Sequence, residues 1–220
     1  MIKIAILSQK GGAGKTTLGL NIAIAAEING KQTAIIDLDP QSSMAQWGDS
    51  REAKTPPVVT TQAQRLQNVL DTCAENDGDF IVIDTAPYAE QTALAAARAA
   101  DMVLIPCRPS IVDLRAVSMT IEICQLAKTP CHVVLNQTPA RGMLTEEAEA
   151  AIKGLGVNLA PVQVGQRVAY IHAVTQGQGV LEYEPRSKAA DEIRALYKFI
   201  LKEIGVKTNG KKERPRRSVA

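Results

Sequence analysis

The residues with the clearest chemistry lie near the start of the chain, in the stretch SQKGGAGKTTL that begins at Ser8. The usual phosphate-binding loop is Gly, four residues, Gly, Lys and then Ser or Thr. Here Gln9 replaces the first Gly, and the rest of the pattern is kept. Glycines have no Cβ, so their backbone N–H groups can turn inward and approach phosphate oxygens closely. The predicted loop comprises Gly11, Gly12, Ala13, Gly14, Lys15, Thr16 and Thr17.

Two side chains of this loop are expected to bind a nucleotide. Lys15 would contact the β- and γ-phosphates, and the Thr16 hydroxyl would bind Mg²⁺. A helix that starts near Lys15 would direct its N-terminal dipole at the same charge. The alternative is a Gly- and Lys-rich turn with solvated charge. The apolar run IKIAILS before the loop and the helical pattern TTLGLNIAIAAEI after it favour the phosphate-binding loop.

The elements that must position this loop alternate along the chain. Strand-like runs occur at residues 2–8, 33–38, 79–84, 102–106, 131–135 and 156–161. Helical patterns occur at residues 18–29, 62–75, 90–100, 113–127, 145–155 and 188–204. This alternation predicts an α/β fold, with a doubly wound, mostly parallel sheet and helices on both faces.

Polar side chains follow three of the predicted strands, where ligands of such sheets bind. Asp37 and Asp39 lie at the end of the second strand. Asp84 follows the apolar run FIVI, a pattern typical of a carboxylate that holds Mg²⁺ through water. Asn136 follows HVVL, and its amide can pair with the edge of a nucleotide base; a plain turn role is equally compatible with the local sequence.

The length of the 220-residue chain favours one α/β domain, which we place at residues 1–205. Apolar residues make up 45% and aromatic residues only 3%, as suits parallel strands under helices. The four cysteines have no metal-ligand spacing, so we expect reduced thiols. No apolar run approaches the roughly 18 residues of a membrane span, and no signal-peptide pattern precedes the first strand. We therefore expect a cytoplasmic protein.

A second region, residues 206–220, is a basic tail that we expect to be disordered in isolation. From Lys207 onward it holds six Lys or Arg and one Glu, whereas the net charge of the whole chain is only +2. Such clusters can neutralise DNA phosphates without reading sequence, although a solvating tail is an alternative. The candidate positions are Lys198, Lys202, Lys207, Lys211, Lys212, Arg214, Arg216 and Arg217.

Four segments together, KGGAGKTT, DLDPQSS, FIVIDTAP and VVLNQ, resemble the ParA/MinD family of deviant Walker ATPases, especially the small ParA partition ATPases. The later segments DMVLIPCRPSIVDLRAV and GQGVLEYEPRSKAADEIRAL extend the resemblance over nearly the whole domain. Lys10 resembles the signature lysine that defines this family. In relatives that lysine reaches across a dimer interface to the phosphates of the partner's ATP, as an arginine finger does. A solvated loop lysine is the alternative.

The resemblance also implies roles for the other site residues. Lys10, Lys15 and Asp39 form the implied catalytic set, with Asp39 orienting the attacking water. Thr16, Asp37 and Asp84 form the implied Mg²⁺ shell, and Asn136 joins the loop in binding ATP or ADP. TAPYAEQT, which follows Asp84, differs from the TPP of larger relatives, so the second switch is left unassigned.

The implied function is an ATP-dependent homodimer that binds DNA non-specifically on the nucleoid. A ParB-like or other centromere-binding adaptor would stimulate hydrolysis, and the system would segregate a plasmid or chromosome. One alternative is the positioning of a protein cargo such as a chemoreceptor cluster or a carboxysome. A MinD-like membrane regulator would require an apolar anchor after the last helix, which the basic tail does not supply. A metallocluster-assembly ATPase would require a surface Cys pair, and Cys107 and Cys124 do not have that spacing.

Overall fold

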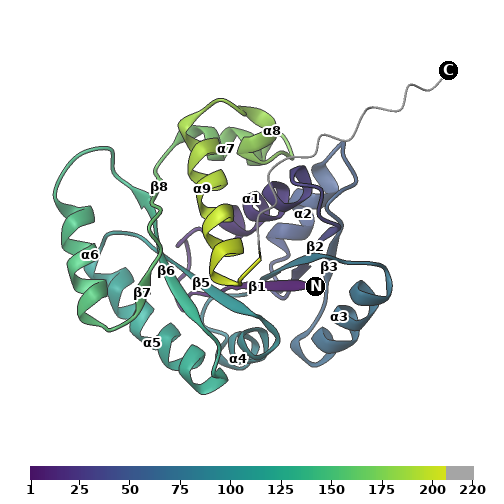
Figure 1. Ribbon diagram of the computed structural model, residues 1–220, viewed down its shortest axis with the longest axis horizontal. Coiled ribbons are helices and arrows are strands. Elements are labelled where there is room, and N and C mark those ends of the chain that lie inside the picture. Colours follow the sequence, from purple (N-terminus) through teal and green to yellow (C-terminus); the bar gives the residue numbers. More distant parts are fainter. Residues whose placement is uncertain (207–220) are drawn as a thin grey trace.

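The computed structural model describes residues 1–206, with a parallel sheet at its centre (Figure 1). The strands are β1 (Ile2–Ile6), β2 (Thr33–Asp37), β3 (Val58–Thr60), β4 (Phe80–Asp84), β5 (Met102–Cys107), β6 (Cys131–Thr138), β7 (Asn158–Leu159) and β8 (Val164–Gly165). Their order is β3-β2-β4-β1-β5-β6-β7, and β8 pairs with β6. Every pair is parallel, so the predicted α/β fold is confirmed.

Helices cover both faces of the sheet (Figure 1). One face carries α1 (Lys15–Ile28), α2 (Ser43–Ser50), α7 (Val168–Thr175), α8 (Val180–Tyr183) and α9 (Lys188–Glu203). The other carries α3 (Leu66–Glu75), which follows the short 3₁₀ turn η1 (Ala63–Arg65), with α4 (Glu90–Ala99), α5 (Ile111–Ala127) and α6 (Leu144–Gly154). In residues 1–206, none of the helices combines the length and apolar character that a membrane crossing requires.

The core consists of two apolar layers, because successive side chains of a strand point to opposite faces. In β1, Ile4 and Ile6 pack with α1 and α9, whereas Ala5 belongs to the opposite layer. Most residues of β1, β2, β4, β5 and β6 are buried, and Ile, Val and Leu predominate among them. This burial holds β1, β2 and β4 side by side, so the loops at their carboxyl ends have fixed positions relative to one another.

Five short elements were not predicted from the sequence: α2, α7, α8, β3 and β8. The longest of them has eight residues, which is too short for a clear periodicity, and packing against distant elements stabilises these segments. The helical pattern over 18–29 belongs to α1, which starts at Lys15, as predicted for the helix after the loop, so the loop lysine lies in the first helical turn. The predicted basic tail beyond Val206 lies outside the described residues, and the domain boundary at 205 stays a prediction.

Candidate nucleotide-binding site

The loop between β1 and α1 has the backbone that its glycines predict. Gly12 and Gly14 have φ values of 75° and 88°, in the left-handed region that side chains disfavour. A Cβ on Gly14 would lie 2.4 Å from Asn136 Nδ2, so a larger residue does not fit there. Gly14 also caps α1 without any side-chain hydrogen bond, and the first turn has no acidic residue. The N–H groups at the start of α1 are therefore available to an anion.

Lys15 lies over this loop with its ammonium group near the backbone. Lys15 Nζ is 3.5 Å from the carbonyl oxygen of Lys10, and the residue is only 7% exposed. Burial lowers the pKa of Lys15, and the negative charges of Asp84 and Asp39 oppose that shift. A buried cation beside a glycine-rich loop suits phosphate oxygens.

The Thr16 hydroxyl and the Asp84 carboxylate meet at the carboxyl end of β4. Thr16 Oγ1 donates to Asp84 Oδ2 at 2.7 Å, and the Thr85 N–H donates to Asp84 Oδ1 at 3.0 Å. Burial raises the pKa of Asp84 to about 7, although the hydrogen bond from Thr16 acts in the opposite direction. A hydroxyl and a carboxylate in contact fit Mg²⁺. Among residues 1–206, no cluster of three His, Cys, Asp or Glu side chains is placed to hold a metal ion.

Asp37 is the last residue of β2, the neighbour of β4, and Asp39 lies two residues beyond it. Asp37 is fully buried, and its two oxygens accept from the N–H groups of Asp39 at 2.9 Å and of Ala45 at 3.2 Å. Burial raises the pKa of Asp37, and these bonds oppose the shift. Asp37 thus shapes the turn that presents Asp39. Asp39 is partly exposed and accepts from the Gln41 N–H, so its carboxylate can reach a water molecule at this edge.

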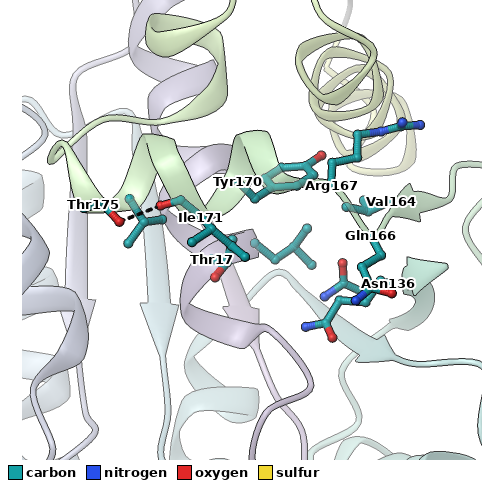
Figure 2. A pocket seen from close by; sticks show the side chains of 12 residues that line it. Thr17, Asn136, Val164, Gln166, Arg167, Tyr170, Ile171 and Thr175 are labelled. Carbon is teal, nitrogen blue, oxygen red and sulfur yellow. Dashed lines mark hydrogen bonds between the residues drawn. The ribbon is translucent and has the colours of Figure 1, made fainter. Parts of the chain in front are cut away.

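Asn136 contacts the phosphate loop directly. Its Nδ2 donates to the Ala13 carbonyl at 2.7 Å, so the amide supports the loop backbone, a contact that was not predicted from the sequence. The neighbouring Gln137 approaches the Gly12 carbonyl at 3.4 Å. Asn136 also lines a pocket of about 370 Å³ beside α1 (Figure 2). The residues around the same pocket include Thr17, Gln166, Arg167, Tyr170 and Ile171.

The pocket wall is held in place by an ion pair. Arg167 Nε donates to Glu192 Oε1 at 3.0 Å, and Tyr170 OH is 3.2 Å from Glu192 Oε2. Glu192 therefore neutralises the charge of Arg167, and the pocket lining also includes the apolar side chains of Leu18, Val164 and Ile171. A flat, weakly polar ring suits a cavity of this kind.

Lys10 does not extend freely into solvent. Its Nζ donates to Asp113 Oδ2 at 2.6 Å, and Arg108 Nε donates to Asp113 Oδ1 at 3.1 Å. The Ser110 hydroxyl also contacts this carboxylate. Burial disfavours ionisation of Asp113, but the hydrogen bonds from Lys10, Ser110 and Arg108 hold its pKa below the usual value. Arg108 and Asp113 were not predicted as site residues. Arg108 directly follows β5, and a position at a strand end is the signal that identified Asp84, whereas Asp113 lies in the first turn of α5.

The raised pKa of Asp84 predicts how the nucleotide-free protein responds to pH. The folded state holds the Asp84 proton more tightly than the unfolded state, so this carboxylate costs stability as pH rises from about 4 to above 7. Asp84→Asn should therefore raise the unfolding free energy by about 2 kcal/mol at pH 8, with a smaller gain at pH 5. Thermal unfolding of both proteins across pH 5–8, without Mg²⁺ or nucleotide, measures the effect. A gain that does not vary with pH would contradict it.

The fold and this site together define a nucleotide-binding protein with a phosphate loop. The family model for the CobQ/CobB/MinD/ParA nucleotide-binding domain matches residues 4–180, and the chain belongs to this family. This match confirms the resemblance drawn from the sequence. The ParA/MinD proteins of this family are nucleotide-binding ATPases.

Relatives and solved structures agree with this assignment. The chain is 31% identical over 209 residues to maintenance of carboxysome distribution protein A of Halothiobacillus neapolitanus, covering 90% of this chain and 95% of that protein. It is 22% identical to the chromosome-partitioning ATPase Soj of Thermus thermophilus, with 92% and 96% covered. The ATP complex of a Cyanothece McdA variant has the same fold, with a TM-score of 0.78, 19% identity and 96% and 99% coverage. MinD of Pyrococcus horikoshii with Mg-ADP also has a TM-score of 0.78, with 18% identity and 94% and 98% coverage.

Proposed function

We propose that the protein is a ParA-type ATPase that dimerises around Mg²⁺-ATP, binds DNA without sequence preference as a dimer, and is reset by partner-stimulated hydrolysis. The observation that carries the proposal is the meeting of Lys15, Thr16 and Asp84 at one edge of the sheet, with Lys10 at the start of the same loop. Together they supply the charged and hydroxyl groups that bind a triphosphate and its metal ion.

In this proposal, different residues of the chain bind the phosphates, hold the metal ion and orient the attacking water. Lys15 and the loop N–H groups would bind the phosphates. Thr16, Asp37 and Asp84 would hold Mg²⁺, which would supply neutralisation of charge on the phosphate oxygens, and Asp37 also fixes the adjacent turn. Asp39 orients the attacking water, and a single carboxylate without a strong base is sufficient for slow turnover, because phosphoryl transfer depends mainly on positioning and electrostatics.

Asn136 and its pocket are proposed to receive the base. With its Nδ2 on the Ala13 carbonyl, Asn136 has its oxygen left to accept from the amino group of adenine. The pocket volume of about 370 Å³ lies within the range of small-ligand sites. If Asn136 both supports the loop and binds the base, base binding would be coupled to the geometry of the loop.

The proposed DNA surface includes the last helix. Lys198 and Lys202 are both exposed on α9, and their spacing of four residues places them on one face. The other basic candidates lie beyond Val206, outside the described residues. The α9 lysines support a basic surface on this helix, which would neutralise DNA phosphates without reading sequence.

The cargo has two candidates. Segregation of plasmid or chromosomal DNA through a ParB-like adaptor is the main proposal, in line with the partition relatives. Positioning of a protein assembly on the nucleoid has equal support, because the relative with 31% identity is named for carboxysome distribution. Fluorescently tagged plasmid loci and candidate assemblies, imaged in the host with and without the gene for this protein, separate the two by which one loses its regular spacing on deletion.

Asp39→Ala tests the hydrolytic half of the proposal. We expect ATP to bind normally while hydrolysis falls about a hundredfold or more, because the attacking water loses its orienting carboxylate. The variant should then stay dimeric and bound to DNA in ATP. Phosphate release and DNA retention measure the two effects. A variant that hydrolyses ATP at the normal rate would move the water-orienting role to another residue.

Removal of residues 207–220 tests the DNA surface. We expect weaker binding to duplex DNA and a salt slope reduced by about 1 for each phosphate that is no longer neutralised, with ATP hydrolysis unchanged. Lys153→Gln on α6 is the matched control, because it removes an exposed lysine from the opposite face. Fluorescence anisotropy at several salt concentrations measures the slope. An unchanged slope would confine the DNA surface to the folded domain.

A further inference from the structure

The hydroxyl of Thr120 accepts a backbone N–H from the start of the phosphate loop. Leu7, two residues earlier, still has a strand partner, because its N–H donates to the Leu104 carbonyl at 3.0 Å. The Gln9 N–H instead donates to Thr120 Oγ1 at 3.3 Å. Gln9 is 3% exposed and Thr120 is fully buried, so water does not compete for this bond. Thr120 thus takes the place of a strand partner where the chain leaves β1.

The acceptor is held in place by α5, the helix that carries Thr120. The Thr120 hydroxyl donates its one hydrogen to the Ala116 carbonyl at 2.8 Å, one turn earlier in the helix, so its lone pairs can accept. Val117 and Ile121 flank these positions and are buried in the apolar layer on this face of the sheet. The bond therefore joins the loop to a packed helix that lies 111 residues later in the chain.

A shift of Gln9 would reach Lys15 through the backbone. Lys10 directly follows Gln9, and the Lys10 carbonyl lies 3.5 Å from Lys15 Nζ. Gln9 has no positive φ, so its backbone does not require the glycine of the usual loop pattern. The position requires an acceptor for its buried N–H, because a buried N–H without a partner is unfavourable. The Thr120 hydroxyl supplies that acceptor.

We propose that Thr120 is a positioning residue for the phosphate loop: its hydroxyl fixes Gln9 and thereby keeps the Lys15 ammonium in the arrangement that binds phosphate. This inference rests on the proposed function, in which Lys15 contacts the phosphates. Without the hydroxyl, the nucleotide-free loop can turn the Gln9 N–H toward water and relax. Nucleotide binding must then restore the original arrangement with that N–H left unpaired, so the cost falls on the affinity for nucleotide.

A purely structural role for Thr120 makes a different prediction. Valine has nearly the shape of threonine, with a methyl group in place of the hydroxyl. If Thr120 only packed α5 against the sheet, Thr120→Val would leave the affinity for nucleotide unchanged, and Thr120→Ser, which removes a buried methyl group, would be the more harmful replacement. If the hydroxyl positions the loop, Thr120→Val is the variant that loses affinity.

The test measures binding of Mg²⁺-ADP to the full chain by isothermal titration, because ADP occupies the loop without a hydrolysis step. Thr120→Val should weaken binding about three- to tenfold, in line with the loss of one hydrogen bond. Thr120→Ser keeps the hydroxyl and should bind like the wild type. Thr33→Val is the matched control, because it removes a buried hydroxyl at the opposite edge of the sheet, where Thr33 Oγ1 donates to the Lys31 carbonyl at 3.0 Å. Unchanged binding by Thr120→Val, or an equal loss in Thr120→Ser, would overturn the inference.

Amide exchange followed by NMR, without nucleotide, measures the contact directly. The Gln9 N–H should exchange about tenfold faster in Thr120→Val than in the wild type or in Thr120→Ser, while the amides of α5 stay protected. Equal protection of the Gln9 N–H in Thr120→Val would contradict the proposed role. If Thr120→Val does not fold, Thr120→Ala replaces it under the same criteria. A wild-type protein that does not bind Mg²⁺-ADP would refute the proposed function, and the exchange of Gln9 would still decide whether Thr120 holds the loop.

Discussion

Lys15→Ala is expected to lower the affinity for ATP about a hundredfold and to abolish every nucleotide-dependent property of the protein. The Lys15 ammonium is buried beside the loop, with its Nζ 3.5 Å from the Lys10 carbonyl. Removal of one buried, charge-assisted contact to phosphate costs about 3 kcal/mol, or about a hundredfold in affinity. Isothermal titration with Mg²⁺-ATP measures the loss.

Lys10→Ala is the matched control for this experiment, because it removes the other lysine of the same loop. We expect this variant to bind ATP as a monomer with nearly normal affinity, since the intramolecular partner of Lys10 is Asp113. Tight ATP binding by Lys15→Ala would refute the assignment of the phosphate loop. Equal losses in both variants would contradict the division of roles between the two lysines.

Arg51→Ala is expected to destabilise the protein by about 3 kcal/mol, because it leaves several acceptors, most of them partly buried, without their buried donor. Arg51 is 3% exposed and donates to the carbonyls of Thr55 and Gly177 and to both oxygens of Glu182. Its guanidinium group also lies 4.6 Å from the centre of the Trp47 ring. These contacts join the end of α2 to α8, so their loss should weaken the packing of both helices.

The stability measurement for Arg51 is a urea unfolding series without nucleotide. Lys153→Ala is the control, because its pair with Glu149, at 3.8 Å, is exposed and should contribute less than about 0.5 kcal/mol. Arg51→Lys should recover only part of the loss, since an ammonium group cannot reproduce the planar contacts of a guanidinium. A loss below about 1 kcal/mol for Arg51→Ala would show that the network contributes little to folding.

The fold and the centre of the site could be predicted from the sequence because both depend on local patterns. Alternating strands and helices define the sheet, and Lys15, Thr16 and Asp84 occupy fixed positions relative to a strand end. The structure brings Thr16 and Asp84 into contact, as Mg²⁺ binding at a strand end requires.

The remaining features depend on contacts between distant segments. Asp113 could not be linked to Lys10 from sequence, because nothing local indicates that the start of α5 lies against the phosphate loop. The hydrogen bond from Asn136 to the Ala13 carbonyl could not be predicted for the same reason, because it also joins distant segments. The short elements α2, α7 and α8 form because packing stabilises them, so their own residues carry little signal.

The central proposal is that ATP, acting through Lys10, switches the protein onto DNA. The most direct measurement is binding of the purified chain to an unrelated DNA duplex and, in parallel, to anionic liposomes, each with ATP, with ADP and as Lys10→Ala. We predict DNA binding that requires both ATP and Lys10, with no binding to liposomes. DNA binding that is equal in ADP or without Lys10 would contradict the proposal, and ATP-dependent liposome binding without DNA binding would indicate a MinD-like membrane regulator.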